Sequence, residues 1–123
     1  MAKKKAFTTW TVAGKDYDLK LKSSGICEAE EKLGGTNILM YIGAENGLPT
    51  LNAMIIIVYC AMKPWNHGIT LDEVYDLYDT YIEEGHNMTE FYTDVFVNIY
   101  EVSGFFGKAQ VKSLEKATEE LKA

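Results

Sequence analysis

The forty residues from His67 to Phe106 constrain the fold most, because they have the pattern of two amphipathic helices in tandem. Thr70 and Glu73 form a capping-box sequence: the threonine oxygen accepts from a free amide at the helix start, and the glutamate reaches back to the threonine amide. Asn87 and Glu90 repeat this start signal after Gly85. The segment therefore predicts two helices joined by a short turn.

The two predicted helices differ in how much apolar surface they carry. The first has apolar residues on one side, namely Leu71, Val74, Tyr78, Tyr81 and Ile82. Its other side carries an acidic stripe of Asp72, Asp76, Asp79 and Glu83. The second is predicted to bury Phe91, Tyr92, Val95, Phe96, Ile99 and Val102. A face this wide needs two neighbours, which are either two internal elements or one internal helix and a partner subunit.

The residues before this pair predict a β-hairpin followed by further helices. Residues 7–22 alternate around an Ala13-Gly14 turn, and their inward side chains are Tyr17, Leu19 and Leu21. Ser23 or Ser24 is expected to cap a short helix that runs from Gly25 to Leu33. The short apolar stretch 37–42 is either a helical turn or a strand.

A central buried helix is predicted to start at Pro49 and to end near Met62, before Pro64. Its apolar residues leave almost no polar face. A buried strand over residues 54–59 is the alternative, because the run is rich in β-branched residues. The proline start and the length favour the helix.

Together these patterns predict an α+β fold, mainly α with an N-terminal β-hairpin and four to five helices. Residues 1–106 are expected to form one globular domain, with the hairpin in 7–22 and the helices in 23–106. Residues 107–123 are expected to be a marginal C-terminal helix or a flexible tail, because they have few apolar anchors. Trp10 and Trp65, which lie near turns, either anchor a partner or close the ends of the core.

Composition and charge exclude several classes of protein. The net charge is −6, and all twelve basic residues are lysines, which argues against nucleic-acid binding because arginine is the usual reader of phosphate and guanine. The longest apolar run, Ala53 to Met62, is too short to cross a membrane, and the lysine-rich start lacks the apolar stretch of a signal peptide. Cys27 and Cys60 have neither metal nor disulfide spacing, so we expect reduced, buried thiols in a cytoplasmic protein.

The sequence shows no catalytic, metal-binding or cofactor-binding constellation. His67 and His86 each lie beside a glycine in a predicted loop, and neither has a partner at a readable spacing. The acids of the stripe lie opposite the apolar face, which is typical of a solvated surface rather than a metal site. We therefore expect a protein that is not an enzyme, has no cofactor, and works through contact.

Four stretches, in this order, resemble the tail assembly chaperones of long-tailed bacteriophages and prophages, particularly those of Gram-positive hosts. They are AGKDYDLKLKSSGICEAEEKLGG, the apolar helix after LPTL, HGITLDEVYDLYDTYIEEG and the closing EVSGFF, and together they cover about residues 10–106. The resemblance implies a non-enzymatic protein in the cytoplasm of the infected or lysogenic host. It implies binding of the tape-measure protein, recruitment of major tail (tube) protein subunits, and absence from the mature virion. Many such families also make a longer form by ribosomal frameshifting, so these residues look like the short form.

For that role we expect five aromatic residues to contribute to self-association or to contact with the client, namely Phe91, Phe96, Tyr100, Phe105 and Phe106. Two alternatives stay open. One is a structural tail-completion or connector component. The other is an acidic interaction module that neutralises a basic partner.

Overall fold

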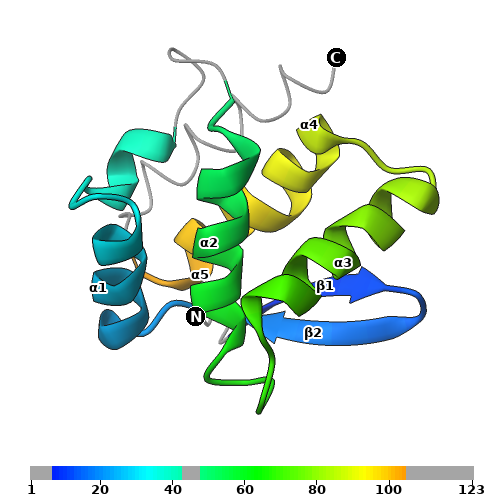
Figure 1. The fold of residues 1–123 in the computed structure, drawn as a ribbon, viewed down its shortest axis with the longest axis horizontal. Helices are drawn as coiled ribbons and strands as arrows, with labels where there is room; N and C mark the ends of the chain where they lie inside the picture. The colour runs from blue at the N-terminus through cyan, green and yellow to red at the C-terminus, as the bar shows by residue number, and fades with distance from the viewer. Residues whose placement is uncertain (1–6, 43–47, 105–123) are drawn as a thin grey trace, which may run out of the picture.

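The chain begins with the β-hairpin that the alternating pattern predicts. The computed structural model describes residues 7–42 and 48–104, and its two strands, β1 (Thr8–Val12) and β2 (Lys15–Leu19), pair antiparallel (Figure 1). Ala13 and Gly14 form the turn with φ of 52° and 77°. Positive φ at both positions is the type I′ geometry that suits the twist of a hairpin. The hairpin buries one face, made of Trp10, Val12, Tyr17 and Leu19, and Leu21 is also buried beyond it.

Two short helical elements follow the hairpin. The first, α1 (Ser23–Lys32), starts two residues earlier than predicted, so its N-cap is Lys22 and the prediction of a serine cap was wrong. Both serines lie inside the first turn, where they cannot serve as the flanking cap. The stretch 37–42 is a helical turn: η1 (Ile38–Tyr41) is a 3₁₀-helix capped by the side chain of Asn37.

The helix α2 (Leu51–Met62) lies in the middle of the molecule, with α1 on one side and α3 on the other (Figure 1). The predicted central helix is therefore confirmed, and the alternative strand is wrong. Its cap is Thr50, whose hydroxyl accepts from the Ala53 amide at 3.2 Å, so Pro49 precedes the helix instead of starting it. Nine of its residues are buried: Ala53, Met54, Ile55, Ile56, Ile57, Val58, Cys60, Ala61 and Met62.

The packing of α1 on α2 depends on a glycine. A Cβ added at Gly25 would lie 3.2 Å from the carbonyl oxygen of Cys60, which is tighter than side chains normally pack. Gly25 therefore allows the two helix backbones to approach closely. An exposed ion pair between Lys63 and Glu28, at 3.1 Å, joins the same two helices at the surface.

The helix α3 (Leu71–Glu83) has the predicted capping box. The Glu73 amide donates to the Thr70 hydroxyl at 3.2 Å, and the Thr70 amide donates to the Glu73 carboxylate at 3.3 Å. Val74, Tyr78 and Tyr81 are buried, and the acidic stripe is exposed, as expected. Ile82 was expected to face the core but is 37% exposed, because Tyr81 takes the inward position in that turn.

The last helical run changes its winding in the middle. It comprises α4 (Met88–Glu90), the π-helix η3 (Phe91–Phe96) and α5 (Val97–Val102). The π segment was not predicted; five of its six residues are buried, and Asp94 is the exposed one. The run packs against α2 and β1 of the same chain, so its wide apolar face has two internal neighbours. Val102, expected in the core, is only half-buried.

The predicted fold class is confirmed: the described residues form helices with an N-terminal two-stranded hairpin. The hairpin and the helices contribute to one cluster of buried side chains. Residues 107–123, for which we predicted a marginal helix or tail, lie outside the described residues, as do Phe105 and Phe106.

The expectation that both cysteines are buried is wrong for one of them. Cys60 on α2 is buried, whereas Cys27 on α1 is exposed, because it lies on the side of α1 that faces away from Gly25 and Ala29. Burial, followed by the nearby Glu28 carboxylate, raises the pKa of the Cys60 thiol from 9.0 to about 11. The thiolate is the form that reacts as a nucleophile. Cys60 should therefore react slowly for two reasons: its side chain is buried, and its raised pKa keeps the thiol protonated.

The two cysteines should therefore react at very different rates. At about pH 8, iodoacetamide should label Cys27 completely while Cys60 stays unmodified in the folded protein. Peptide mass spectrometry of the labelled chain would measure both sites. Labelling in denaturant, where both should react, is the control, and equal rates in the folded protein would contradict the assignment.

A buried hydrogen bond joins α5 to η1. The hydroxyl of Tyr100 donates to the carbonyl oxygen of Ile38 at 2.6 Å, and both residues are fully buried. Burial also raises the pKa of Tyr100 above its ordinary value.

Replacing Tyr100 with Phe should destabilise the fold by about 1–3 kcal/mol, because the Ile38 carbonyl would lose a buried partner. Urea denaturation followed by circular dichroism would measure the loss. The control is Tyr75→Phe, which removes an exposed hydroxyl hydrogen bond to Asn52 at 3.2 Å and should cost less than about 0.5 kcal/mol. Equal losses in the two variants would contradict the assigned role of Tyr100.

Candidate binding groove

Three of the five aromatic residues predicted to contact a partner are part of the chain's own core, and the other two, Phe105 and Phe106, lie outside the described residues. Phe91, Phe96 and Tyr100 each have 0% exposure, because α2 and β1 cover the face of the helix on which they lie. In this fold they are not available to a partner and act by holding the helix in place. A binding site on the described residues would therefore have to be formed by surface side chains.

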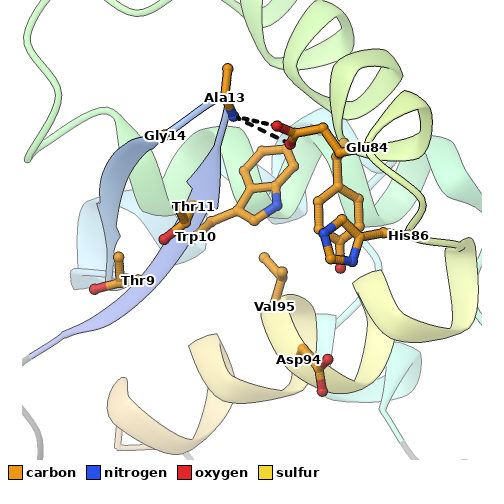
Figure 2. Close-up of a pocket in the computed structure, with 10 residues that line it drawn as sticks. Thr9, Trp10, Thr11, Ala13, Gly14, Glu84, His86, Asp94 and Val95 are labelled. Carbon is orange, nitrogen blue, oxygen red and sulfur yellow. Dashed lines mark hydrogen bonds between the residues drawn. The ribbon is translucent and has the colours of Figure 1, made fainter.

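A groove of about 490 Å³ lies between the hairpin, the end of α3 and the π segment (Figure 2). A groove of this volume lies in the range of small-ligand and peptide sites. We call it the β1 groove. Its lining residues are Thr9, Trp10, Thr11, Ala13, Gly14, Tyr81, Glu84, His86, Asp94 and Val95.

One end of the β1 groove is closed by a contact between the hairpin turn and α3. The Ala13 amide donates to both carboxylate oxygens of Glu84, at 3.0 and 3.2 Å (Figure 2). Ala13 has a positive φ, which is unfavourable for a residue with a Cβ, so the turn gains from a charged acceptor at this amide. The two residues are 71 positions apart in the chain, and no local sequence signal connects them.

An aromatic wall lines the side of the groove nearest α3. The ring of His86 stacks on Tyr81 with centroids 4.2 Å apart and planes 10° apart. His86 Nδ1 lies 2.9 Å from a carboxylate oxygen of Glu90, which also accepts from the side chain of Asn87 through its other oxygen. Burial, and then the charges of Glu90 and Asp94, raise the pKa of Tyr81 to about 12.

The expectation that His86 has no partner was therefore wrong. The two residues are only four positions apart in the sequence, but His86 lies before the N-cap Asn87 and is not on the helix, so helical periodicity does not predict the contact. The contact was also hidden by the capping role of the same glutamate, since the Glu90 amide donates to the Asn87 side chain at 2.9 Å. His67 lies elsewhere, in a smaller hollow of about 240 Å³ beside Lys15 and Glu73.

Trp10 places a buried, unpaired donor beside the groove. The side chain is 2% exposed, and its indole Nε1 has no hydrogen-bond partner among the described residues. Figure 2 shows the indole nitrogen on the edge of the ring that faces His86 and Val95. A buried N–H without an acceptor costs about 1–3 kcal/mol, so it is a feature that a bound acceptor would relieve.

The charge of the groove is negative. Glu84 and Asp94 line it, Glu90 lies beside it, and none of its lining residues is a lysine. In the described residues there is no group of three His, Cys, Asp or Glu side chains placed to hold a metal ion. The hydroxyls of Thr11 and Thr9 donate to Asp16 and Asp18. What the groove offers is hydrogen bonding and negative charge for a bound partner.

Comparison with known proteins places the chain in a family. A family model described as a family of unknown function (DUF6096) matches residues 3–122. The chain belongs to this family. Neither the curated proteins nor the solved structures contain a significant match to this DUF6096 chain. No helix in the part of the DUF6096 chain that the structure describes is long and apolar enough to cross a membrane.

The contact between Glu84 and the hairpin turn can be tested by mutation. Glu84→Ala should destabilise this DUF6096 chain by about 1 kcal/mol, because the Ala13 amide loses a charged acceptor. Denaturation would measure the stability, and amide hydrogen exchange should become faster at Ala13. Glu83→Ala is the matched control, since its exposed side chain has no interaction with the described residues. The same effect in both variants would show that the contact contributes nothing.

Proposed function

We propose that the chain is a non-enzymatic tail assembly chaperone of a long-tailed bacteriophage or prophage. It binds the tape-measure protein and keeps it soluble in the cytoplasm of the infected or lysogenic host. It also helps to recruit major tail (tube) protein subunits, and it leaves before the virion is complete. The order of four stretches over about residues 10–106 supports this proposal, since they resemble proteins with this role.

The observation that carries the proposal is an apolar side chain pair on the surface of η1. Met40 is 65% exposed, more than any other large apolar residue described, and the adjacent Leu39 is 39% exposed. Leu48, before α2, is 36% exposed. A chaperone that coats an apolar helical client needs exposed apolar side chains on a soluble body. We therefore assign the client contact to Leu39 and Met40, in place of the buried aromatic residues.

The acidic surface supplies the second requirement, which is solubility of the complex. The stripe on α3 is exposed along the length of the helix, and the whole chain has a net charge of −6. Like charge on many bound copies would keep a coated client dispersed. Modest contacts from a short 3₁₀ turn also suit release when the tube forms. Self-association of the chain would use the same kind of apolar contact.

Co-expression with the tape-measure protein tests the proposal. The client should be insoluble alone, and soluble and co-purified in the presence of this chain. The double variant Leu39→Lys with Met40→Lys should lower the amount of co-purified client about ten-fold, because it places charges in the apolar contact. Ile82→Lys is the control, since Ile82 has a similar exposure to Leu39 but lies on α3.

Two results would overturn the proposal. A client that is equally soluble with and without this chain would exclude the chaperone role. Finding the chain as a fixed component of purified particles would favour the alternative of a structural tail component. If the double variant and the Ile82 variant bind the client equally well, the chaperone role stands and the assigned contact is wrong.

A further inference from the structure

The hairpin has two outer edges, and they differ in how their backbone groups are satisfied. The turn has two residues, so Val12 and Lys15 are the hydrogen-bonded pair that closes it. In an antiparallel ladder such pairs alternate with pairs that do not exchange hydrogen bonds. The backbone groups of Trp10 therefore face β2, and those of Thr9 and Thr11 point outward from the free edge of β1.

The outer edge of β2 is covered by the chain itself. The Asp18 carbonyl accepts from the Asn66 side chain at 2.9 Å, and the Lys20 amide donates to the Ala61 carbonyl at 3.1 Å. The Lys20 carbonyl accepts from the Trp65 indole at 3.0 Å. The end of α2 and the loop after it thus bind the outer edge of β2 in the way that a neighbouring strand would.

The outer edge of β1 is satisfied at only one position. The Ala13 amide is bound by Glu84, which takes the place that a strand carbonyl would occupy. Within residues 7–42 and 48–104, no group pairs with the outward amides of Thr9 and Thr11, and both residues are exposed. This open part of the edge is the side of the β1 groove that the hairpin supplies.

We propose that the β1 groove binds an extended segment of a partner protein as a third strand, with basic side chains on its solvent face. The partner backbone would pair with the outward N–H and C=O groups of Thr9 and Thr11. A carbonyl or side-chain acceptor of the same segment would reach the unpaired indole N–H of Trp10. This inference does not rest on the chaperone role, because it uses a different surface and a partner in a different conformation.

The charges around the edge select the chemistry of the partner. On the exposed face of the hairpin, Thr9 and Thr11 lie opposite Asp18 and Asp16, so the outer side chains of a third strand would lie beside the two threonines and one strand away from the two aspartates, within reach of long basic side chains. Glu84 and Asp94 add negative charge along the groove. The inner side chains would lie toward Trp10 and Val95, where apolar groups fit. The expected segment alternates apolar and basic residues.

A model peptide tests the proposal with the whole chain. Acetyl-Val-Lys-Val-Lys-Val-amide is titrated into the ¹⁵N-labelled protein, and the amides of Thr9 and Thr11 and the indole N–H of Trp10 should shift together. The indole of Trp65 is an internal control, because it is already bonded to the Lys20 carbonyl. The same peptide with glutamate in place of lysine should bind more weakly by about three-fold or more.

Two changes remove the strand pairing itself. Thr9→Pro deletes one outward N–H without touching the ladder with β2, and an edge strand tolerates proline at such a position. It should weaken peptide binding by about three- to ten-fold, while Thr9→Val, which keeps the amide, should bind like the parent chain. If Thr9→Pro does not fold, a peptide N-methylated at both lysines and at the central valine, which lacks the N–H groups that would face β1 in either strand direction, should show the same loss on the unaltered protein.

The proposal is overturned if neither the proline variant nor the methylated peptide binds more weakly, or if the shifts avoid Thr9 and Thr11. Absence of any shift at millimolar peptide would overturn it as well. Protection of these amides that grows with protein concentration, without peptide, would identify a second copy as the occupant and would also overturn it.

Discussion

The structure depends on the need to cover α2 on all sides. A helix with nine buried residues in twelve and no charged residue is not stable when exposed to water, so several other elements are placed by packing on it. The helices α1 and α3 cover two sides, and β2 and the π segment also contact it. Gly25 shows how close this packing is, because α1 approaches the α2 backbone without room for a side chain.

The same constraint explains why three of the predicted contact residues, Phe91, Phe96 and Tyr100, are buried. The last helical run presents a wide apolar face, and its π segment turns five of six residues inward. Such a face is filled either by another molecule or by the chain itself. In this fold the chain itself covers the face, because α2 and β1 pack against it. The aromatic rings of Phe91, Phe96 and Tyr100 fill the core there.

The apolar side chains and backbone groups that remain exposed therefore indicate where a partner could bind. The apolar pair Leu39–Met40 lies on a single 3₁₀ turn, while the free edge of β1 lies beside an acidic groove. The first surface suits an apolar helical client, and the second suits an extended basic segment. An assembly factor that meets one partner while handing over to another would need two such surfaces.

The sequence by itself determined the features that depend on neighbours along the chain. The capping box at Thr70, the inward set Tyr17, Leu19 and Leu21, and the buried character of α2 all follow from local spacing and apolar periodicity. Even the pairing of His86 with Glu90 is local, although the capping role of Glu90 concealed it.

Only the tertiary structure decided which surfaces are free. The Glu84 contact with Ala13 joins residues 71 positions apart, and the unequal edges of the hairpin depend on where the end of α2 lies. The π winding of Phe91–Phe96 likewise was not predicted from the sequence and is seen only in the folded chain. The physical reason is that burial depends on how the elements pack together. An apolar or polar pattern indicates which environment a residue favours, but only the packed fold determines whether another element covers that residue.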